Sequence, residues 1–567
     1  MSEEHAIPDE PSSTEPRWPR PHVAATLASY EASVPGRASQ RQFSLEAEVP
    51  RTTLQYWIGR KASLDAEPSV IAFFESPVGL AVLHRIVGAL HLVFTLVGPC
   101  GVDLVSLFLE LSHLNRFVGS SHGSQHQVSA QVQKATIAFE QKETARLASA
   151  MSPKKITVCE DETFHPEICL VGIEPVSGFI LLESYSERRD AATWNEAMEN
   201  ATQGLAVQIV QATGDEASGL RAHARDGLGA HHSPDLFHVS HEVTKGICPA
   251  LASKTREAAV ALQKAEKQTL GAKAERDAFE DPGRKRGPGR RPGFEKRIDE
   301  ATQQEEATRG ALAEAVERQG DVREAINGLS SAYHPFDLAT GAARSAAEVA
   351  RSLEGQFDQI ERVITEAGLS ERARAHVEKA RRVLPAMRET VAFVHCQILA
   401  MVAALSLSVE VELVVLELLL PGLYLHRVAA KAPTAERSES VDAVASRLLA
   451  QARAPDSPLA TLSAAERATV ERVALECADL FQRSSSCVEG RNGQLALHHH
   501  SLHRLSAKKL QALTVVHNFF IRRADGTTAA ERFFGTRPAD LFEWILDNIA
   551  VPVRPAKSRS VSHIRAA

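Results

Sequence analysis

The sequence predicts a mostly helical α+β protein of two to four domains, with one small mixed sheet interrupted by a large all-helical insertion. Three observations lead to this fold class. The chain has 567 residues, more than one hydrophobic core usually supports. Ala, Leu and Glu are abundant, whereas only 5% of the residues are aromatic, which favours helix. Sequence patterns typical of strands concentrate between residues 155 and 239 and nearly vanish from Val243 to Phe481.

The first 20 residues are acidic and rich in proline, and we expect them to form a disordered tail, as we do residues 548–567. The start lacks the basic residues and apolar run of a secretory signal. The seven cysteines form no C-x-x-C pair, which argues against a zinc ribbon and a disulfide framework. We therefore expect a cytoplasmic protein.

Residues 21–62 predict a helix-turn-helix domain. Apolar residues recur at helical spacing around Val49-Pro50: Phe43, Ala47, Val49, Leu54 and Trp57. The first helix is expected from Ser39 to Ala47 and the recognition helix from Arg51 to Trp57. Its polar side chains are the predicted DNA contacts: Arg51, Thr52, Thr53 and Gln55. An ordinary helical hairpin is the alternative.

Residues 76–150 predict a helical connector or a second DNA-binding region. Two apolar stretches, Gly79–Val97 and Val391–Leu407, approach the length of a membrane span. Charged or polar side chains interrupt both, so we expect buried helices and no membrane association.

Residues 155–245 predict the first part of the core. Three runs of β-branched and apolar residues indicate an antiparallel meander: Ile156–Asp161, Ile168–Ile173 and Gly178–Glu183. A helix (Ala191–Thr202), a strand (Val207–Ala212), a helix from about Ala217 and a strand (Pro234–Val239) follow. The expected order is β-β-β-α-β-α-β.

Residues 246–480 predict the helical insertion. Glu257–Ala278 and Phe294–Leu329 indicate a helical hairpin, and the Pro- and Gly-rich linker 281–293 forms its basic tip. The cationic side chains of this tip resemble those that enter narrow minor grooves, although a solvated linker has the same composition. The candidate DNA contacts there are Arg284, Lys285, Arg286, Arg290 and Arg291. Residues 481–547 are expected to complete the core.

Two acids stand where strands of the predicted sheet end. Asp161 closes the first strand, and strand alternation puts its neighbours Glu160 and Glu162 on the opposite face. Asp215 follows the fourth strand, where an Asp can also serve only as a turn or cap residue. Carboxylates on adjacent strand ends are suitable ligands for hard divalent cations.

A third acid carries a family resemblance. The segment Glu489-Gly490-Arg491-Asn492 resembles the E-G-x-N signature around the last catalytic glutamate of bacterial insertion-sequence transposases and Mutator-like elements. Those families also carry a C/D-x-x-H motif after the second Asp, and Asp235-Leu236-Phe237-His238 stands in that place.

The resemblance implies a ribonuclease H-like core and a metal-dependent DNA transposase. By it, Asp161, Asp215 and Glu489 are the catalytic residues and the ligands of two ions, Mg²⁺ or alternatively Mn²⁺, about 4 Å apart. Four residues would support the site: Asp235, His238, Arg491 and Asn492. A purely structural role for Asp235 and His238, such as capping the next helix, is the alternative.

Basic residues follow the glutamate. We expect His503, Arg504, Lys508 and Lys509 to contact DNA. The adjacent run His498–His500 suggests DNA contact, a packing role or a transition-metal site.

The expected partners are double-stranded DNA, both element ends and target, and further copies of this chain. The expected location is the bacterial nucleoid. The net charge of −7 requires local DNA-binding patches. The chain lacks a G-x-x-x-x-G-K-[ST] loop, so we expect no dependence on ATP. The rival functions are a non-catalytic DNA-binding protein derived from a transposase and another nuclease, such as a junction resolvase.

Overall fold

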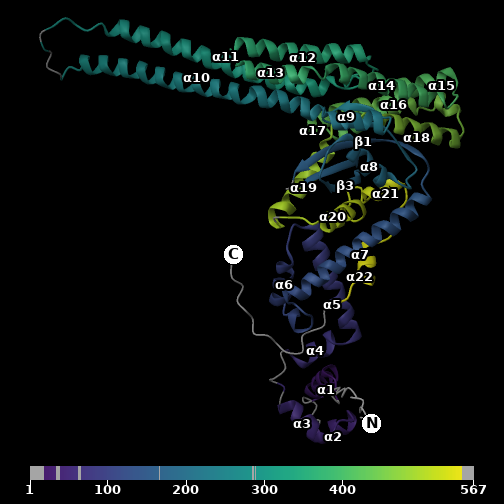
Figure 1. Cartoon of the computed structure of the whole chain (residues 1–567). Helices are drawn as coiled ribbons and strands as arrows, with labels where there is room; N and C mark the ends of the chain where they lie inside the picture. Colours follow the sequence, from purple (N-terminus) through teal and green to yellow (C-terminus); the bar gives the residue numbers. More distant parts are fainter. Residues whose placement is uncertain are drawn as a thin grey trace, which may run out of the picture. The chain divides into compact units, whose positions relative to one another are not determined.

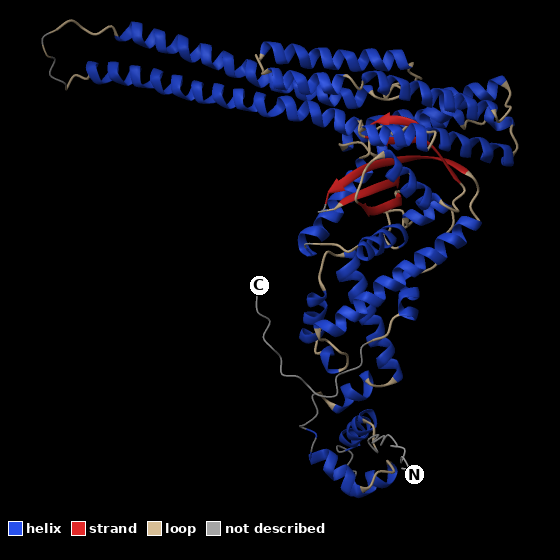
Figure 2. Ribbon diagram, in the orientation of Figure 1, coloured by secondary structure: helices blue, strands red, loops and turns tan. Residues whose placement is uncertain are grey.

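The computed structural model describes residues 18–33, 39–59, 61, 66–164, 167–283, 287, 289–502 and 504–551. These residues are mostly helical, with a single five-stranded mixed sheet among the described strands (Figure 2). The predicted class of a mostly helical α+β protein is confirmed. The chain divides into two compact units, a terminal unit (Met1–Met151 with Gly493–Ala567) and a sheet unit (Ser152–Asn492).

The terminal unit is helical. Its elements before the sheet are α1 (Arg20–Ser33), α2 (Gln40–Glu46), α3 (Arg51–Gly59), α4 (Pro68–Phe74), α5 (Pro77–Leu90), the π-helix η3 (His91–Val97), α6 (Val102–Leu111), the short η4 (Leu114–Arg116) and α7 (His122–Ser149). Its elements after the sheet unit are α20 (Ala507–Phe519), α21 (Ala529–Phe534) and α22 (Leu541–Asn548).

The helices α1, α2 and α3 pack around a small core, as the apolar spacing predicts. Leu27, Phe43, Val49, Leu54 and Trp57 are all buried in it. The side chain of Ser39 caps α2 by accepting from the amide of Gln42, and a turn with Glu48 at φ 53° separates α2 from α3. The helices α2 and α3 therefore form a helical hairpin that packs with α1, an arrangement that both the predicted helix-turn-helix and an ordinary helical hairpin would have.

The long helix α7 is the spine of the rest of this unit. The rings of Phe139 and Phe519 meet edge to face at 5.5 Å between centroids, which joins α7 to α20. The indole of Trp544 donates to the carbonyl of Ala135 at 2.9 Å, which joins α7 to α22. The chain from Gly493 onward therefore belongs to the terminal unit, and of the segment 481–547 predicted as the last part of the core, the residues up to Asn492 lie in the sheet unit.

The sheet unit begins with three antiparallel strands, β1 (Lys154–Phe164), β2 (Ile168–Glu174) and β3 (Phe179–Ser186). After α8 (Ala191–Thr202), β4 (Val207–Gly214) pairs parallel with β1. The short helices α9 (Ser218–Ala222) and η5 (His223–Gly227) lead to β5 (His231–Pro234), which pairs parallel with β4. The strand order is β3-β2-β1-β4-β5.

The fifth strand lies earlier in the chain than the predicted Pro234–Val239. The strand is His231–Pro234, and residues from Leu236 onward form a helix instead. The carboxylate of Asp235 accepts from the amide of Phe237 at 2.7 Å and so caps this helix. The alternative of a capping role for Asp235 is therefore confirmed.

One face of the sheet is covered by α8 and α9. Val158, Leu170 and Leu182 from the strands pack there against Trp194 and Met198 of α8. The remainder of the sheet unit is a helical bundle with its own large core. Its elements are α10 (Leu236–Glu280), α11 (Phe294–Ala332), α12 (Ala346–Glu366), α13 (Glu371–Arg381), α14 (Leu384–Ala403), α15 (Val409–Val414), η6 (Val415–Leu419), α16 (Leu420–Ala430), α17 (Ala435–Ala452), η7 (Pro458–Thr461) and α18 (Ala464–Leu480).

The predicted helical hairpin is formed by α10 and α11, which run side by side over most of their length (Figure 1). The first of these helices begins at Leu236 rather than near Glu257, because Asp235 caps it there. The sheet unit ends at Asn492, within the first half of α19 (Ser486–Leu502).

Three helical segments among the described residues are long and apolar enough to cross a membrane, by length and composition alone: Pro77–Val97, Glu371–Ala403 and Val409–Ala430. The first two overlap the apolar stretches noted in the sequence. Each contains residues that are buried within the fold, among them Leu83, Val391 and Leu420.

Candidate metal centre

The segment that leads into α19 lies along the face of β1 that carries Asp161. The hydroxyl of Thr157 donates to the carbonyl of Leu480 at 3.3 Å, and the thiol of Cys159 donates to the carbonyl of Ser484 at 3.6 Å. Because side chains alternate along a strand, Thr157, Cys159 and Asp161 share this face. Further along the same face of β1 comes Asp161. Further along the segment comes Glu489, in the first turn of α19.

Asp161, His238 and Glu489 form a compact cluster. One potential ligand atom from each of these side chains lies within 4.8 Å of the other two. Asp161 comes from β1, His238 from the first turn of α10 and Glu489 from the first turn of α19. Two carboxylates and an imidazole at this separation can hold one divalent cation.

The electrostatic surroundings of Asp161 are unfavourable to its charge. The pKa of this carboxyl is raised to about 7, chiefly by burial; His238 and a hydrogen bond from the amide of Glu162 act in the opposite direction, and the charges of Glu489 and Asp215 add smaller upward contributions. That amide lies 2.8 Å from Oδ1 of Asp161. Such a perturbed carboxyl among converging acids is typical of functional sites. A bound cation would offset the repulsion.

Asp215 lies at the edge of this cluster. In the parallel register of β1 and β4, Cys159 pairs with Thr213, and Asp161 and Asp215 each lie two residues further on. Oδ1 of Asp215 accepts from the amide of Ala217 at 2.8 Å, so this residue also serves as a turn residue. Its other oxygen leaves capacity for a ligand, although Asp215 is not part of the 4.8 Å cluster.

Asp235 connects the elements that carry the site. Its amide donates to the carbonyl of Gly214 at the end of β4, at 3.0 Å. One carboxylate oxygen caps α10, and the other accepts from the hydroxyl of Ser485, which lies just before α19. The backbone of Ser485 in turn accepts from the amide of Glu489 at 3.3 Å. Asp235 therefore fixes the starts of both helices, and the sequence offered no signal for its bond with Ser485.

Glu160 and Glu162 point to the other face of the sheet, as alternation predicts. Glu160 lies 3.2 Å from Nε2 of the buried His223. Glu162 accepts from the indole of Trp194 at 3.2 Å and from Arg189 at 3.4 Å. Both side chains are engaged there, which leaves Asp161 as the acid of β1 that faces Glu489.

Arg491 forms a buried, bidentate ion pair with Glu183 of β3. Its Nε lies 2.8 Å and its Nη2 2.6 Å from the two carboxylate oxygens, and the side chains are only 6% and 0% exposed. The pair joins α19 to β3 two residues beyond Glu489. Glu183 was not singled out in the sequence, where it ends an otherwise apolar run. Nearby, Oδ1 of Asn492 is buried and has no hydrogen-bond partner in the described part of the chain.

The predicted DNA contacts of the recognition helix lie on the outer side of α3. Arg51, Thr52 and Gln55 are exposed and Thr53 is half-buried, while Leu54 and Trp57 face the core. At the hairpin tip, Arg290 and Arg291 are exposed. The predicted contacts Arg284, Lys285, Arg286 and His503 lie outside the described residues.

The basic residues after α19 divide into two groups. Arg504 and Lys508 are exposed. Lys509 is buried, and its ammonium donates to the carbonyl of Thr95 within the terminal unit. Burial lowers the pKa of Lys509 to about 8. The DNA contact expected of Lys509 is wrong for this structure, because α20 turns that side chain into the protein.

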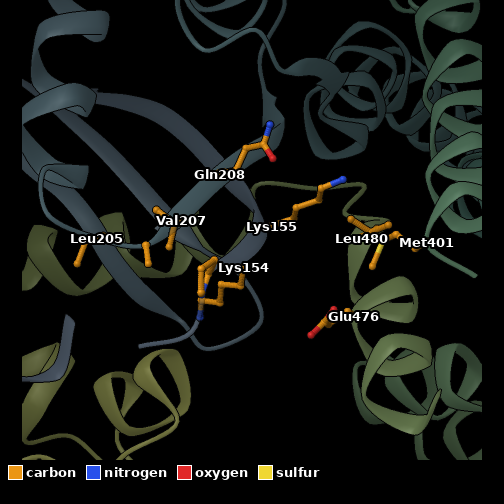
Figure 3. Close-up of a pocket in the computed structure, with 10 residues that line it drawn as sticks. Lys154, Lys155, Leu205, Val207, Gln208, Met401, Glu476 and Leu480 are labelled. Atoms are coloured by element: carbon orange, nitrogen blue, oxygen red, sulfur yellow. The ribbon is translucent and has the colours of Figure 1, made fainter. Parts of the chain in front are cut away.

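A pocket of about 540 Å³ lies at the opposite ends of the same strands (Figure 3). It is lined by the starts of β1 and β4 and by side chains of α14 and α18, including Lys154, Val207, Met401 and Glu476. Asp161 and Asp215 belong to the carboxyl ends of these strands, so the pocket is separate from the candidate metal centre.

Residues 415–561 match a family of unknown function (DUF6399). This part of the chain includes Glu489 and the Glu-Gly-Arg-Asn segment, but not Asp161, Asp215 or His238. No curated protein and no solved structure matches the chain.

Proposed function

We propose that this protein is a DNA transposase that cleaves and joins phosphodiester bonds at the ends of a mobile element. The observation that carries the proposal is the convergence of Asp161 and Glu489, 328 positions apart by their numbers, within one cluster small enough to hold a cation. Acids that converge from distant parts of a chain onto the edge of a sheet are what two-metal phosphoryl transfer requires.

The strand order supports a ribonuclease H-like core. Three antiparallel strands followed by two parallel ones, in the order β3-β2-β1-β4-β5, are the arrangement expected of that fold. The first acid then lies on the central strand and the second directly after its parallel neighbour. The bundle α10–α18 occupies the place of the helical insertion before the glutamate helix.

The side chains fit divalent cations. Carboxylate oxygens of Asp161, Asp215 and Glu489 are hard ligands, suited to Mg²⁺ or Mn²⁺. Burial raises the pKa of Asp161, with smaller contributions from the charges of Glu489 and Asp215, and a bound cation would compensate this buried negative charge. When bound, two such ions would activate water and the DNA 3′ hydroxyl as successive nucleophiles and stabilise the leaving oxygen.

The remaining residues hold this arrangement in place. Arg491 fixes α19 through Glu183, and Asp235 fixes the starts of α10 and α19. The exposed side chains of α3 would recognise the element ends in the major groove. The proposal includes double-stranded DNA as the partner, assembly of several copies on paired ends, and action at the bacterial nucleoid without ATP.

A strand-transfer assay tests the proposal against its rivals. The purified full-length protein is incubated with Mg²⁺ or Mn²⁺, a plasmid target and labelled DNA from the flanks of its own gene. We expect joining of the labelled 3′ ends to the plasmid, and loss of joining in Asp161→Asn and Glu489→Gln. Glu196→Gln, which changes an exposed acid of α8, is the matched control and should join normally.

Each rival predicts a different product. A junction resolvase would cut branched DNA and join no ends. A non-catalytic DNA-binding protein would retard the flanking DNA in a gel and leave it intact with every variant. Either result contradicts the transposase proposal.

A further inference from the structure

We propose that His238 is a direct ligand of the metal held by Asp161 and Glu489, so that the centre binds Mn²⁺ in preference to Mg²⁺. The inference rests on the proposed function, which assigns the metal to carboxylates alone. It adds a nitrogen ligand from α10 and thereby a preference among metals.

The imidazole of His238 lies close enough to both carboxylates to share a cation with them. A ring nitrogen of His238 lies within 4.8 Å of a carboxylate oxygen of both Asp161 and Glu489, which are themselves within that distance of each other. A cation between three such atoms needs only small side-chain movements, because ligand bonds of about 2 Å place ligand atoms about 3 Å apart. Three protein ligands leave positions open for water and a substrate oxygen.

One ring nitrogen of His238 lacks a hydrogen-bond partner among the described residues. This atom, Nε2, is buried, although 35% of the whole side chain is exposed. Buried polar atoms without partners are rare and call for an explanation, such as an ion. A cation in the cluster supplies one.

Asp235 does not account for this ring nitrogen. Its Oδ2 lies 3.6 Å from Nε2 of His238, which is too far for a hydrogen bond. Both oxygens of Asp235 are already used, one by the amide of Phe237 and the other by the hydroxyl of Ser485. Asp235 therefore places a carboxylate beside the imidazole without accepting a hydrogen bond from Nε2. A carboxylate in this position favours a cation nearby.

The backbone holds His238 in this position. The amide of Leu236 donates to the carbonyl of Arg483 at 2.9 Å, and Asp235 is bound to the end of β4. Leu236 and Val239 on either side are 5% and 4% exposed, so the first turn of α10 is anchored. A ligand on an anchored turn is preorganised, which lowers the entropic cost of binding.

The chemistry of the ligand set gives the metal preference. Mg²⁺ favours oxygen ligands and keeps most of its water, whereas imidazole binds transition metals well. Mn²⁺ accepts both oxygen and nitrogen. We therefore expect Mn²⁺ to bind at least about 10-fold more tightly than Mg²⁺, and removal of the imidazole to weaken Mn²⁺ binding by about 10- to 100-fold or more.

Electron spin-echo spectroscopy of bound Mn²⁺ tests the inference without relying on activity. The full-length protein is stripped of metal with a chelator, loaded with substoichiometric Mn²⁺ and examined for nitrogen coupling, with ¹⁵N-histidine labelling to identify the source. His238→Ala and His238→Asn remove the imidazole. His241→Ala, which changes an exposed histidine one turn later on α10, is the matched control.

We expect histidine nitrogen coupling in the wild type and in His241→Ala, and its loss in both His238 variants, together with the weaker Mn²⁺ affinity by calorimetry. Circular dichroism identifies any variant that is unfolded. If one of the two His238 variants is unfolded, the nitrogen coupling and Mn²⁺ affinity of the other one test the inference. Mn²⁺ that binds through Asp161 and Glu489 without histidine coupling would overturn the role of His238 and leave the proposed function standing. Mn²⁺ binding that is unchanged in Asp161→Asn and Glu489→Gln would overturn both.

Discussion

The buried ion pair between Arg491 and Glu183 should be the contact whose loss most weakens the attachment of α19, the helix that carries Glu489. The substitution Arg491→Met removes the guanidinium and leaves Glu183, which is fully buried, without its bidentate partner. Breaking a buried pair in this way costs about 3–5 kcal/mol. The double variant Arg491→Met with Glu183→Leu should recover most of that lost stability, because the two apolar side chains leave no buried charge without a partner.

Hydrogen exchange followed by mass spectrometry suits this test, because it reports stability segment by segment and a chain of two compact units is not expected to unfold in a single step. A local loss of about 3–5 kcal/mol corresponds to roughly 10²- to 4 × 10³-fold faster exchange of peptides from β3 and the start of α19, at about 1.4 kcal/mol per tenfold. Arg225→Met is the control, since its pair with Asp226 is exposed and contributes at most about 1 kcal/mol. Unchanged exchange in Arg491→Met, or a double variant as damaged as the single one, would refute the reasoning.

Three further predictions follow from the described contacts. Lys509→Met should raise the thermal stability of the terminal unit below pH 8, where the buried ammonium is charged. This gain should shrink as the pH rises from about 8 toward 10.5. In that range the folded wild type releases a proton that the unfolded chain retains, so the wild type itself becomes more stable. Thermal unfolding at pH 7 and pH 10 checks this, and a gain that grows with pH would contradict it. Asp235→Ala should destabilise the sheet unit by about 1–3 kcal/mol, because it removes a helix cap and leaves the hydroxyl of Ser485 unpaired; exchange in the first turns of α10 and α19 measures it, and exchange confined to wild-type rates would count against it. Arg51→Ala should weaken binding to the element ends and lower the salt dependence of binding by about one phosphate contact, whereas an unchanged salt slope would argue against α3 as the DNA-binding helix.

Local sequence patterns predicted the elements whose own residues specify them. The apolar spacing around Val49-Pro50 located α2 and α3 with their buried residues, and β-branched runs located the first four strands within a few residues. The fifth strand, His231–Pro234, contains no β-branched or large apolar residue. These residues form a strand because β4 offers an edge with which they pair. The four residues themselves carry no sign of that edge, so they could not be predicted as a strand.

The candidate metal centre was predictable to a similar extent. Glu489 stands in a specific local motif, and Asp161 and Asp215 follow from the order of strands. The closeness of His238 to Asp161 depends on where α10 begins, and the sequence pattern placed a strand there. The DNA contact predicted for Lys509 was wrong because a lysine next to an exposed lysine usually indicates a solvated face. Here α20 is packed tightly enough to enclose the side chain of Lys509.

The rate of metal-dependent DNA cleavage at this centre tests the central claim most directly. Labelled DNA carrying the flanks of the gene is incubated with the purified protein, and nicking is followed over time with and without Mn²⁺ or Mg²⁺. We predict cleavage only when a divalent ion is present, and rates lower by more than about 100-fold in folded Asp161→Asn and Glu489→Gln, with Glu196→Gln unchanged. Undiminished cleavage in both acid variants would contradict the assignment of this cluster as the catalytic site.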